Sequence, residues 1–212
     1  MKNKKIRYAV MGLGHIAQVA VLPAFKHAQQ NSELVALISD TPSKLNQIGK
    51  KYGISKSNQF SYEEFPQCLV DAEIDVLYLA TPNDTHCKYA IDALSMGVHV
   101  LCEKPLAISQ KQCEAMIKAS ELNNRLLMTA YRLHFEVANL TALKMIKDEK
   151  LGKIRTFNSS FTMQVKDIDN IRLNSPKDGG GPIWDIGIYC INGVRSLFQD
   201  EPTEVFAYAV NN

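Results

Sequence analysis

Short apolar runs alternate with helical stretches of about 10–15 residues through the first 130 residues, and this alternation most restricts the fold. The apolar runs that resemble buried strands are 6–11, 34–39, 74–80, 98–102 and 125–130. Thr41-Pro42 and Ser109 are typical helix starts, while Gly53 and Gly97 are typical helix ends. Strands that alternate with helices in this way predict an α/β fold, a doubly wound parallel sheet covered on both faces.

A glycine-rich turn follows the first apolar run. Ile6–Met11 leads directly into Gly12-x-Gly14-x-x-Ala17, and a helix is expected from His15 to Gln29. Glycines let the backbone approach a pyrophosphate, and a helix N-terminus offers unpaired N–H groups and the positive end of a dipole. The sequence therefore predicts a Rossmann-type domain over residues 1–130. Its predicted phosphate-binding residues are Gly12, Gly14, His15 and Ile16.

The end of the second apolar run bears on the choice between NAD and NADP. An acidic residue there binds the ribose hydroxyls of NAD, whereas hydroxyls and cations suit the 2′-phosphate of NADP. Ser39 is expected at the last position of the strand, and Lys44 lies one turn into the following helix. Both favour a phosphate, while Asp40 favours NAD. We expect NADP as the cofactor, with NAD as the alternative.

Polar segments also follow the strand runs 74–80 and 98–102. Ligands bind outside the carboxyl ends of the strands in parallel sheets, so these segments are expected near the cofactor. Asn83 is expected to cap the next helix and to lie near the nicotinamide. His86 is a candidate cofactor contact, but it could equally be an ordinary residue of the first helical turn. The predicted cofactor-binding residues at this edge are Thr81, Pro82, Asn83, His86, Glu103 and Lys104.

The pattern changes near Tyr131, where a second domain is expected. A helix at 136–150, a β-rich run at 154–165 and a polar loop at 166–178 precede Gly179-Gly180-Gly181. A helix over 182–198 and a last strand over 204–210 follow. We expect residues 131–212 to form an incomplete α+β domain.

The helix after the glycine run has one polar face. Asp185, Tyr189 and Asn192 are spaced i, i+4 and i+7, which places them on the same side. The adjoining apolar stripe is expected in the core. A glycine run lets the loop approach another element closely, so we expect the polar face to line a site rather than face water.

Composition argues against several partners. Lys and Arg together number 24 and Asp and Glu 22, a net charge of +2 that predicts no nucleic-acid or membrane partner. No apolar stretch approaches the ~20 residues of a membrane span, and no signal peptide is recognised. The five cysteines are odd in number and form no C-x-x-C pair, which predicts reduced thiols in the cytoplasm and no metal site.

Taken together, these segments resemble the Gfo/Idh/MocA family, which includes glucose–fructose oxidoreductase and inositol dehydrogenase. The resemblance is carried by GLGHIA, ATPNDTH, CEKPLA, AYRLHF and GGGPIWDIGIYCIN, in the family's order and over nearly the whole chain. AYRLHF, LGKI and the Tyr at 189, where many members have His, are most similar to the glucose–fructose oxidoreductase and dihydrodiol dehydrogenase branches.

The resemblance implies an NAD(P)-dependent oxidoreductase of a sugar, a polyol or a related cyclic alcohol. It implies that Lys104 reaches the substrate carbon that exchanges hydride, that Tyr189 donates or accepts the proton, and that Asp185 supports the substrate and these two residues. A Lys before Pro is biased toward an extended backbone, which would aim its ammonium from the sheet edge into the cleft. A cation there would favour the phenolate form of a nearby Tyr. The candidate substrate contacts are Arg132, His134 and Asn192.

Members of this family are longer, and their second domain is a large open sheet that often forms a dimer interface. The resemblance therefore implies that residues 131–212 are a truncated second domain for substrate binding and oligomerisation, and a homo-oligomer is possible. The alternative function is a catalytically impaired or non-catalytic dinucleotide-binding fragment. The presence of Lys104, Asp185 and Tyr189 together favours the enzyme.

Overall fold

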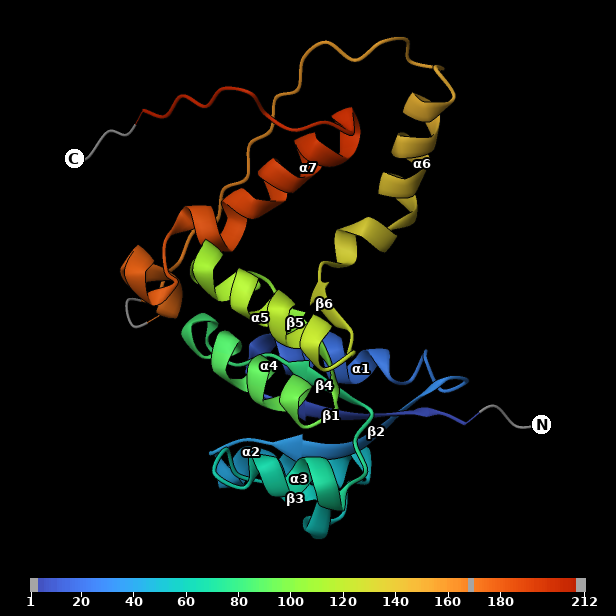
Figure 1. Ribbon diagram of the computed structural model, residues 1–212, viewed down its shortest axis with the longest axis vertical. Helices are drawn as coiled ribbons and strands as arrows, with labels where there is room; N and C mark the ends of the chain where they lie inside the picture. Colours follow the sequence, from blue (N-terminus) through green and yellow to red (C-terminus); the bar gives the residue numbers. More distant parts are fainter. Residues whose placement is uncertain (1–3, 168–169, 209–212) are drawn as a thin grey trace. The chain divides into compact units, whose positions relative to one another are not determined.

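The computed structural model describes residues 4–167 and 170–208, and the chain divides into two compact units (Figure 1). The first unit contains Met1–Ala130 and Asn174–Gly179, and the second contains Tyr131–Leu173 and Gly180–Asn212. The short segment Asn174–Gly179 therefore belongs to the first unit, although residues of the second unit precede and follow it in the sequence.

The first unit is built on a six-stranded parallel sheet with the strand order β3-β2-β1-β4-β5-β6. Met11 at the end of β1 pairs with Ile38 of β2 on one side and Leu79 of β4 on the other. The strand order reverses direction at β1, which confirms the doubly wound α/β sheet. The strands are β1 Ile6–Met11, β2 Ser32–Ile38, β3 Gln59–Phe60, β4 Val76–Leu79, β5 His99–Glu103 and β6 Leu127–Ala130.

Helices connect these strands, and local sequence signals set several of their ends. Pro42 occupies the first turn of α2, and Gly53 ends that helix with a φ of 71° in the left-handed region. Ser109 caps α5 by accepting a hydrogen bond from the Gln112 N–H at 3.3 Å. The helices of this unit are α1 Leu22–Ala24, α2 Pro42–Tyr52, α3 Phe65–Asp71, α4 His86–Ser95 and α5 Gln110–Leu122.

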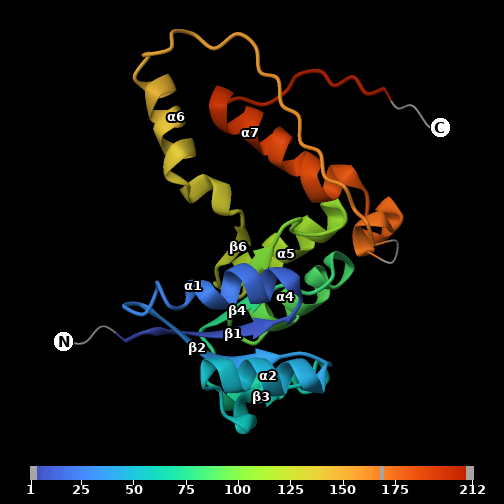
Figure 2. The same cartoon turned by 180° about the vertical axis from the view of Figure 1, so that it is seen from behind.

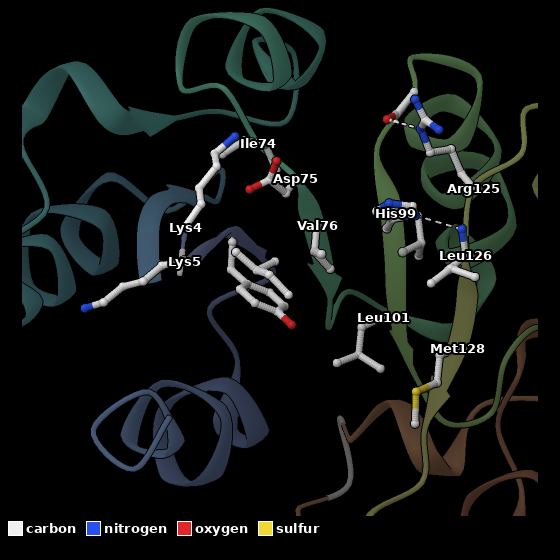
Figure 3. Close-up of a pocket in the computed structure, with 14 residues that line it drawn as sticks. Lys4, Lys5, Ile74, Asp75, Val76, His99, Leu101, Arg125, Leu126 and Met128 are labelled. Carbon is white, nitrogen blue, oxygen red and sulfur yellow. Dashed lines mark hydrogen bonds between the residues drawn. The ribbon is translucent and has the colours of Figure 1, made fainter. Parts of the chain in front are cut away.

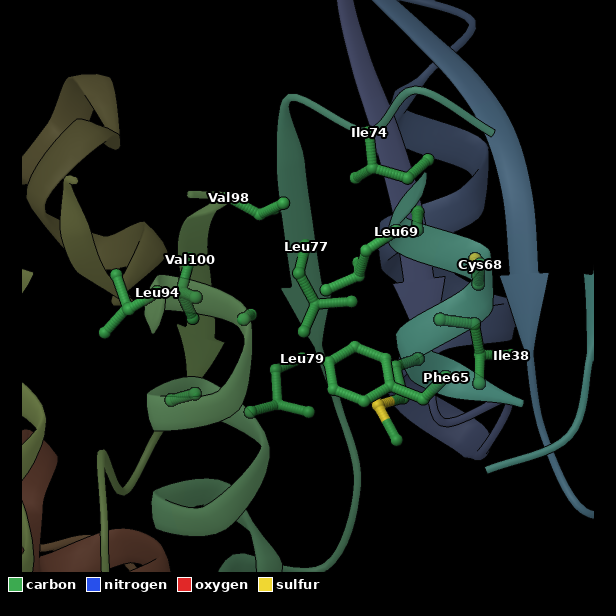
Figure 4. Close-up of a cluster of buried hydrophobic side chains, with 14 of the residues drawn as sticks. Ile38, Phe65, Cys68, Leu69, Ile74, Leu77, Leu79, Leu94, Val98 and Val100 are labelled. Carbon is green, nitrogen blue, oxygen red and sulfur yellow. The ribbon is translucent and has the colours of Figure 1, made fainter. Parts of the chain in front are cut away.

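Side chains on the two faces of the sheet form two apolar cores. On one face, Leu77 and Leu79 of β4 pack with Phe65 of α3 and Leu94 of α4 (Figure 4). On the other face, Val10 of β1 packs with residues of α1 and α2. Figure 1 shows α3, α4 and α5 in front of the sheet, and Figure 2 shows α1 from the opposite side. Each large side chain that is fully buried in this way contributes roughly 1.5–3 kcal/mol.

The first predicted helix is shorter than expected. Helical structure begins at His15, passes through a π-helical turn at Ala17–Val21 and ends with α1 at Ala24, not at Gln29. The following residues form tight turns instead: the Lys26 N–H donates to Pro23 O at 3.1 Å and the His27 N–H to Ala24 O at 2.9 Å. Hydrogen bonds from each N–H to the carbonyl three residues earlier replace the α-helical pattern there.

The strand β3 was not predicted, because two residues are too few to give a sequence signal.

The second unit contains helices α6 Val137–Lys147 and α7 Ile188–Phe198, with a π-helical turn at Ile183–Gly187 before α7. The predicted strand over 154–165 is wrong, and so is the described part, 204–208, of the predicted strand 204–210. Positions 209 and 210 lie outside the described residues. A strand needs a neighbour that pairs its backbone N–H and C=O groups, and neither segment pairs as a strand within the described part of this unit.

Candidate functional site

The carboxyl end of β1 leads into a turn in which two glycines meet different requirements. Gly12 has a φ of +92°, and a Cβ there would lie 2.4 Å from the Ala80 carbonyl oxygen, so only glycine fits. A Cβ at Gly14 would meet nothing within 4 Å. Gly14 therefore borders open space directly before the exposed residues His15 and Ile16 of the first helical turn. This open cradle at a helix start fits the pyrophosphate of a dinucleotide.

At the end of β2, the structure corrects the predicted strand end. β2 ends at Ile38, so Ser39 lies just beyond it, although the Ser39 N–H still donates to Phe60 O at 2.9 Å. Ser39 is 5% exposed, and its Oγ accepts from the Thr41 N–H at 3.2 Å. Asp40 is exposed, and its Oδ1 accepts from the Tyr62 N–H at 2.7 Å. One carboxylate oxygen of Asp40 thus already holds the loop that follows β3.

After β4, Asn83 makes a contact that its place in the sequence does not reveal. Its Nδ2 donates to the Gly179 carbonyl oxygen at 2.8 Å. The prediction that Asn83 caps the following helix is wrong, because the helical turn begins after Pro82 without a side-chain cap. Gly179 has a φ of +77°, and a Cβ there would lie 2.6 Å from Ile108 Cγ2 and 2.9 Å from Asn83 Cβ. The start of the glycine run therefore packs closely within the first unit.

His86, the first residue of α4, is fully buried. Its Nδ1 lies 3.0 Å from Pro105 O, and its Nε2 lies 3.0 Å from Thr81 O. Burial lowers the pKa of His86 below its ordinary value, and this outweighs the two carbonyls and Glu103, which act in the opposite direction. The ring is thus part of the packed wall beneath the turns that end β4 and β5.

The turn after β5 carries Lys104 and is held at Glu103. The Tyr78 hydroxyl donates to Glu103 Oε1 at 2.8 Å, and the Lys104 N–H donates to Glu103 Oε2 at 3.3 Å. Burial, reinforced by the neighbouring Glu103, raises the pKa of Tyr78, so its hydroxyl stays a donor. The Lys104–Pro105 peptide bond is cis. The backbone from which the Lys104 side chain starts is thus fixed by a network of buried and half-buried groups.

In the second unit, Asp185 lies in the π-helical turn and forms an ion pair with Arg172. Arg172 Nε lies 2.7 Å from Asp185 Oδ2, and the Asp185 side chain is only 14% exposed. The Gly181 N–H also donates to Arg172 O at 2.8 Å. Sequence reasoning missed Arg172, since it lies in a polar loop without periodicity; a cation shortly before the predicted Asp185 was the available signal.

Tyr189, one turn further on, lies among aromatic rings. Its ring centroid is 5.5 Å from that of Tyr131 and 5.4 Å from that of Phe161. Burial raises the pKa of Tyr131, and Tyr189 and Cys190 act in the same direction. Asn192 Oδ1 accepts from the Ser196 hydroxyl at 3.3 Å. The roles of Tyr131 and Phe161 as neighbours of Tyr189 were not predicted.

Two of the three residues predicted to contact substrate, Arg132 and His134, lie in the turn Arg132–Phe135. Arg132 Nη1 lies 3.4 Å from Glu136 Oε1, and both side chains are exposed. The His134 ring is exposed and lies 4.8 Å from the Tyr131 ring. An exposed pair of this kind contributes little to stability.

A groove of about 640 Å³ lies elsewhere, toward the amino ends of the strands of the first unit (Figure 3). Its lining includes Lys5, Asp75, His99 and Arg125, which precede or begin their strands. The phosphate cradle and Lys104 are at the carboxyl ends of the strands. This groove is therefore not the predicted site.

The predicted catalytic residues belong to different units: Lys104 to the first, and Asp185 and Tyr189 to the second. The first unit brings together the turns at Gly12–Ile16, Thr81–His86 and Glu103–Pro105, because the carboxyl ends of β1, β4 and β5 are neighbours in the sheet. The second unit brings Asp185 to Arg172 and Tyr189 to Tyr131. That Lys104 and Tyr189 meet stays a prediction.

No group of three or more His, Cys, Asp or Glu side chains that could hold a metal ion occurs in residues 4–167 and 170–208. The five cysteines are free thiols, and burial raises the pKa of Cys68 to about 12. No helix in the same described ranges is both long enough and apolar enough to span a membrane.

The doubly wound sheet and its open glycine turn define the first unit as a dinucleotide-binding domain of the Rossmann type. Residues 6–131 match the family described as "Oxidoreductase family, NAD-binding Rossmann fold", and residues 139–212 match the "GFO/IDH/MocA C-terminal domain". The chain belongs to the Gfo/Idh/MocA oxidoreductase family, as its motifs suggested.

Individual relatives agree with this assignment. The D-xylose 1-dehydrogenase [NADP(+)] of Haloarcula marismortui is 29% identical over 96% of this chain and 57% of its own length. The aldose-aldose oxidoreductase of Caulobacter crescentus, solved with glycerol, is 38% identical, with a TM-score of 0.84 over 94% of this chain and 59% of its own. A 3-ketoreductase of Actinomadura kijaniata, solved with NADP and TDP-benzene, is 29% identical, with a TM-score of 0.80 over 92% of this chain and 58% of its own. The chain thus spans somewhat under three fifths of these relatives.

Proposed function

We propose that this chain supplies the cofactor-binding domain and part of the catalytic site of an NADP-dependent oxidoreductase. Its reaction would transfer hydride between the nicotinamide and a sugar, a polyol or a related cyclic alcohol or carbonyl compound. The observation that carries the proposal is the open cradle at Gly14, at the same sheet edge as the turn of Lys104. Relatives named for D-xylose and aldose substrates support this substrate class.

The cofactor would lie across the carboxyl edge of the sheet. The backbone from Gly12 to Ile16 would hold the pyrophosphate, and the Ser39 hydroxyl with the Lys44 ammonium would hold a 2′-phosphate. Ser39 Oγ accepts from the Thr41 N–H, which leaves its O–H hydrogen to donate. Asp40 already accepts from the Tyr62 N–H, so one of its oxygens is occupied. These contacts favour NADP over NAD. When bound, the cofactor supplies hydride transfer at its nicotinamide.

The proton chemistry would fall to Lys104, Tyr189 and Asp185. The Lys104 ammonium would contact the reacting oxygen of the substrate and stabilise negative charge there. Tyr189 would donate or accept the proton, and Asp185, held by Arg172, would orient the substrate or the other two groups. Arg132, His134 and Asn192 would contact further hydroxyls. The five free thiols fit a reducing compartment, and we propose the cytoplasm.

Cofactor and sugar titrations test this function. NADPH and NADH are each titrated into the purified chain and followed by fluorescence. A panel of aldoses and polyols is then added with NADP⁺ or NAD⁺ as the hydride acceptor, and the same sugars and related carbonyl compounds are added with NADPH or NADH as the hydride donor. The absorbance of the reduced cofactor is recorded in both directions. We expect NADPH to bind more tightly and at least one sugar to exchange hydride. Binding without turnover by any sugar would favour the non-catalytic alternative, and no binding of either cofactor would refute the proposal.

The choice of cofactor has its own matched pair of variants. Lys44→Ala should weaken NADPH by ~10-fold and leave NADH unchanged, since a charge-assisted hydrogen bond contributes about 1.5 kcal/mol. Lys50→Ala, at an exposed position in the last turn of the same helix, is the control and should change neither affinity. An equal loss for both cofactors in Lys44→Ala, or a preference of the unmodified chain for NADH, would show that Asp40 decides instead.

A further inference from the structure

His86 lies between the two turns that end β4 and β5. Its side chain is 0% exposed, and its two ring nitrogens each lie 3.0 Å from a backbone carbonyl oxygen. The carbonyl at Nε2 is that of Thr81, and the carbonyl at Nδ1 is that of Pro105, the residue directly after Lys104. One buried ring therefore connects both turns.

The contacts of the ring are polar and directional. A neutral imidazole has one N–H donor and one acceptor nitrogen, and burial favours this neutral form. The neutral ring therefore donates one hydrogen bond, to one of the two carbonyls, and only packs against the other, so it connects the two turns by one hydrogen bond together with close packing. A side chain that only filled space would need neither nitrogen at these positions.

The turn of Lys104 is also held on its other side. The Tyr78 hydroxyl donates to Glu103 Oε1 at 2.8 Å, and Glu103 Oε2 accepts from the Lys104 N–H at 3.3 Å. Tyr78 lies on β4, and His86 lies on the helix that follows β4. The residue before Lys104 and the residue after it are thus each fixed by a separate side chain.

We propose that His86 is a positioning residue for Lys104, which it serves by fixing the Pro105 end of the turn to Thr81. The assignment rests on the proposed role of Lys104 in the oxidoreductase. On this proposal His86 acts through Lys104, whereas its position in the sequence predicted a direct contact with the cofactor. Loss of this positioning should lower turnover strongly, because a displacement of 1 Å at a catalytic group can reduce turnover by ~10²-fold.

Hydrogen exchange tests the proposal without any cofactor. His86→Gln is compared with His99→Gln, a matched control at the opposite end of β5, where His99 Nδ1 accepts from the Leu126 N–H at 2.8 Å. In His86→Gln, the amides of residues 103, 104, 106 and 107 should exchange at least ~10-fold faster, while those of β1 and β2 keep their protection. His99→Gln should leave residues 103–107 unchanged.

Kinetics separate positioning from general loss of structure. With a sugar that the chain turns over, His86→Gln should lower kcat by ~10–100-fold, with little change in NADPH affinity. In the Lys104→Met background, the same substitution should have almost no further effect, because the group that it positions is gone. Full additivity of the two substitutions would overturn the proposal, as would unchanged protection of residues 103–107.

One measurement needs no variant and covers the case in which His86→Gln does not fold. Nitrogen NMR of the histidine rings in the unmodified chain should show one ring that stays neutral when the pH is lowered below the ordinary histidine pKa of ~6.5, with a single N–H that exchanges slowly. If all the histidine rings titrate near ~6.5 and exchange rapidly, the bridging contact is absent. Failure of the chain to bind NADPH would refute the proposed function but would leave the exchange and NMR results as they stand.

Discussion

The guanidinium of Arg172 holds the carboxylate of Asp185, with Nε 2.7 Å from Oδ2. The two residues are 13 positions apart, and the glycine run lies between them. Arg172 also accepts the Gly181 N–H through its own carbonyl oxygen. One residue of a polar loop therefore fixes both the backbone before the π-helical turn and the acidic side chain within it.

Loss of this ion pair should affect turnover more than stability. Arg172→Met is expected to lower kcat by ~10-fold or more, because Asp185 loses the group that orients it. The free energy of unfolding should fall by at most ~1 kcal/mol, since the Arg172 side chain is 45% exposed and solvent screens the pair. Steady-state kinetics and urea unfolding measure the two effects. Arg155→Met, at an exposed arginine of the same unit, is the control, and an equal loss of kcat there would contradict the assignment.

Tyr189 and Lys104 should be needed for turnover and not for cofactor binding. A general acid–base group typically contributes ~10²–10⁴-fold, so Tyr189→Phe should lower turnover by that order while NADPH affinity is nearly unchanged. Lys104→Met should lower turnover at least as much, because it also removes a substrate contact. The test needs a form of the protein complete enough to turn over. Full activity of Tyr189→Phe would exclude the proposed proton route.

Gly12 and Gly14 should separate folding from binding. Gly14→Val should abolish binding of both cofactors with little loss of stability, because its Cβ points into open space. Gly12→Ala should instead lower the free energy of unfolding by more than ~1 kcal/mol, because alanine is strained at a positive φ and its Cβ meets Ala80. Thermal unfolding and NADPH titration distinguish the two variants. Unchanged NADPH affinity in Gly14→Val would show that the loop does not bind the pyrophosphate.

Gly179 should be required for the packing of the segment 174–179 within the first unit. Gly179→Ala puts a Cβ 2.6 Å from Ile108 Cγ2 and 2.9 Å from Asn83 Cβ, and it does so at a φ of +77°. We expect a loss of stability of ~1–3 kcal/mol and faster hydrogen exchange at residues 174–179. Gly152→Ala, also at a positive φ but with nothing within 4 Å of its Cβ, controls for backbone strain alone. Equal losses in the two variants would mean that close packing at Gly179 has no role.

His86 should make the stability of the chain depend on pH below neutrality. Its pKa is lowered in the folded state, so the unfolded chain binds more protons once the pH falls through ~6.5. The free energy of unfolding should therefore decrease as the pH falls from 7 toward 5. Urea unfolding at several pH values should show a shallower decrease in His86→Gln than in the unmodified chain. Parallel curves for the two would show that His86 is not disfavoured in its charged form.

Much of the first unit could be predicted from sequence, because its signals are local. Alternating apolar strands and helices require a sheet covered on both faces, and Pro42, Gly53 and Ser109 mark helix ends through the backbone angles and hydrogen bonds that these residues favour. Likewise, a glycine turn between a strand and a helix is enough to predict a phosphate cradle. The sequence did not show that Gly12 is required for packing whereas Gly14 borders open space. That difference arises because the Ala80 carbonyl lies next to Gly12 in the folded chain.

Tertiary structure decided the partners of the polar groups. The sequence placed His86 near the cofactor edge, but its burial depends on how α4 packs on the sheet and on the carbonyls of Thr81 and Pro105. The pairing of Arg172 with Asp185 and of Asn83 with Gly179 also joins residues whose separations follow no helix or strand period. The predicted strand at 154–165 did not form, nor did the described part, 204–208, of the strand predicted at 204–210. β-propensity is local, whereas a strand exists only when a neighbour pairs its backbone. The residues determined which elements and chemical groups this protein has, and long-range packing decided which of those groups meet.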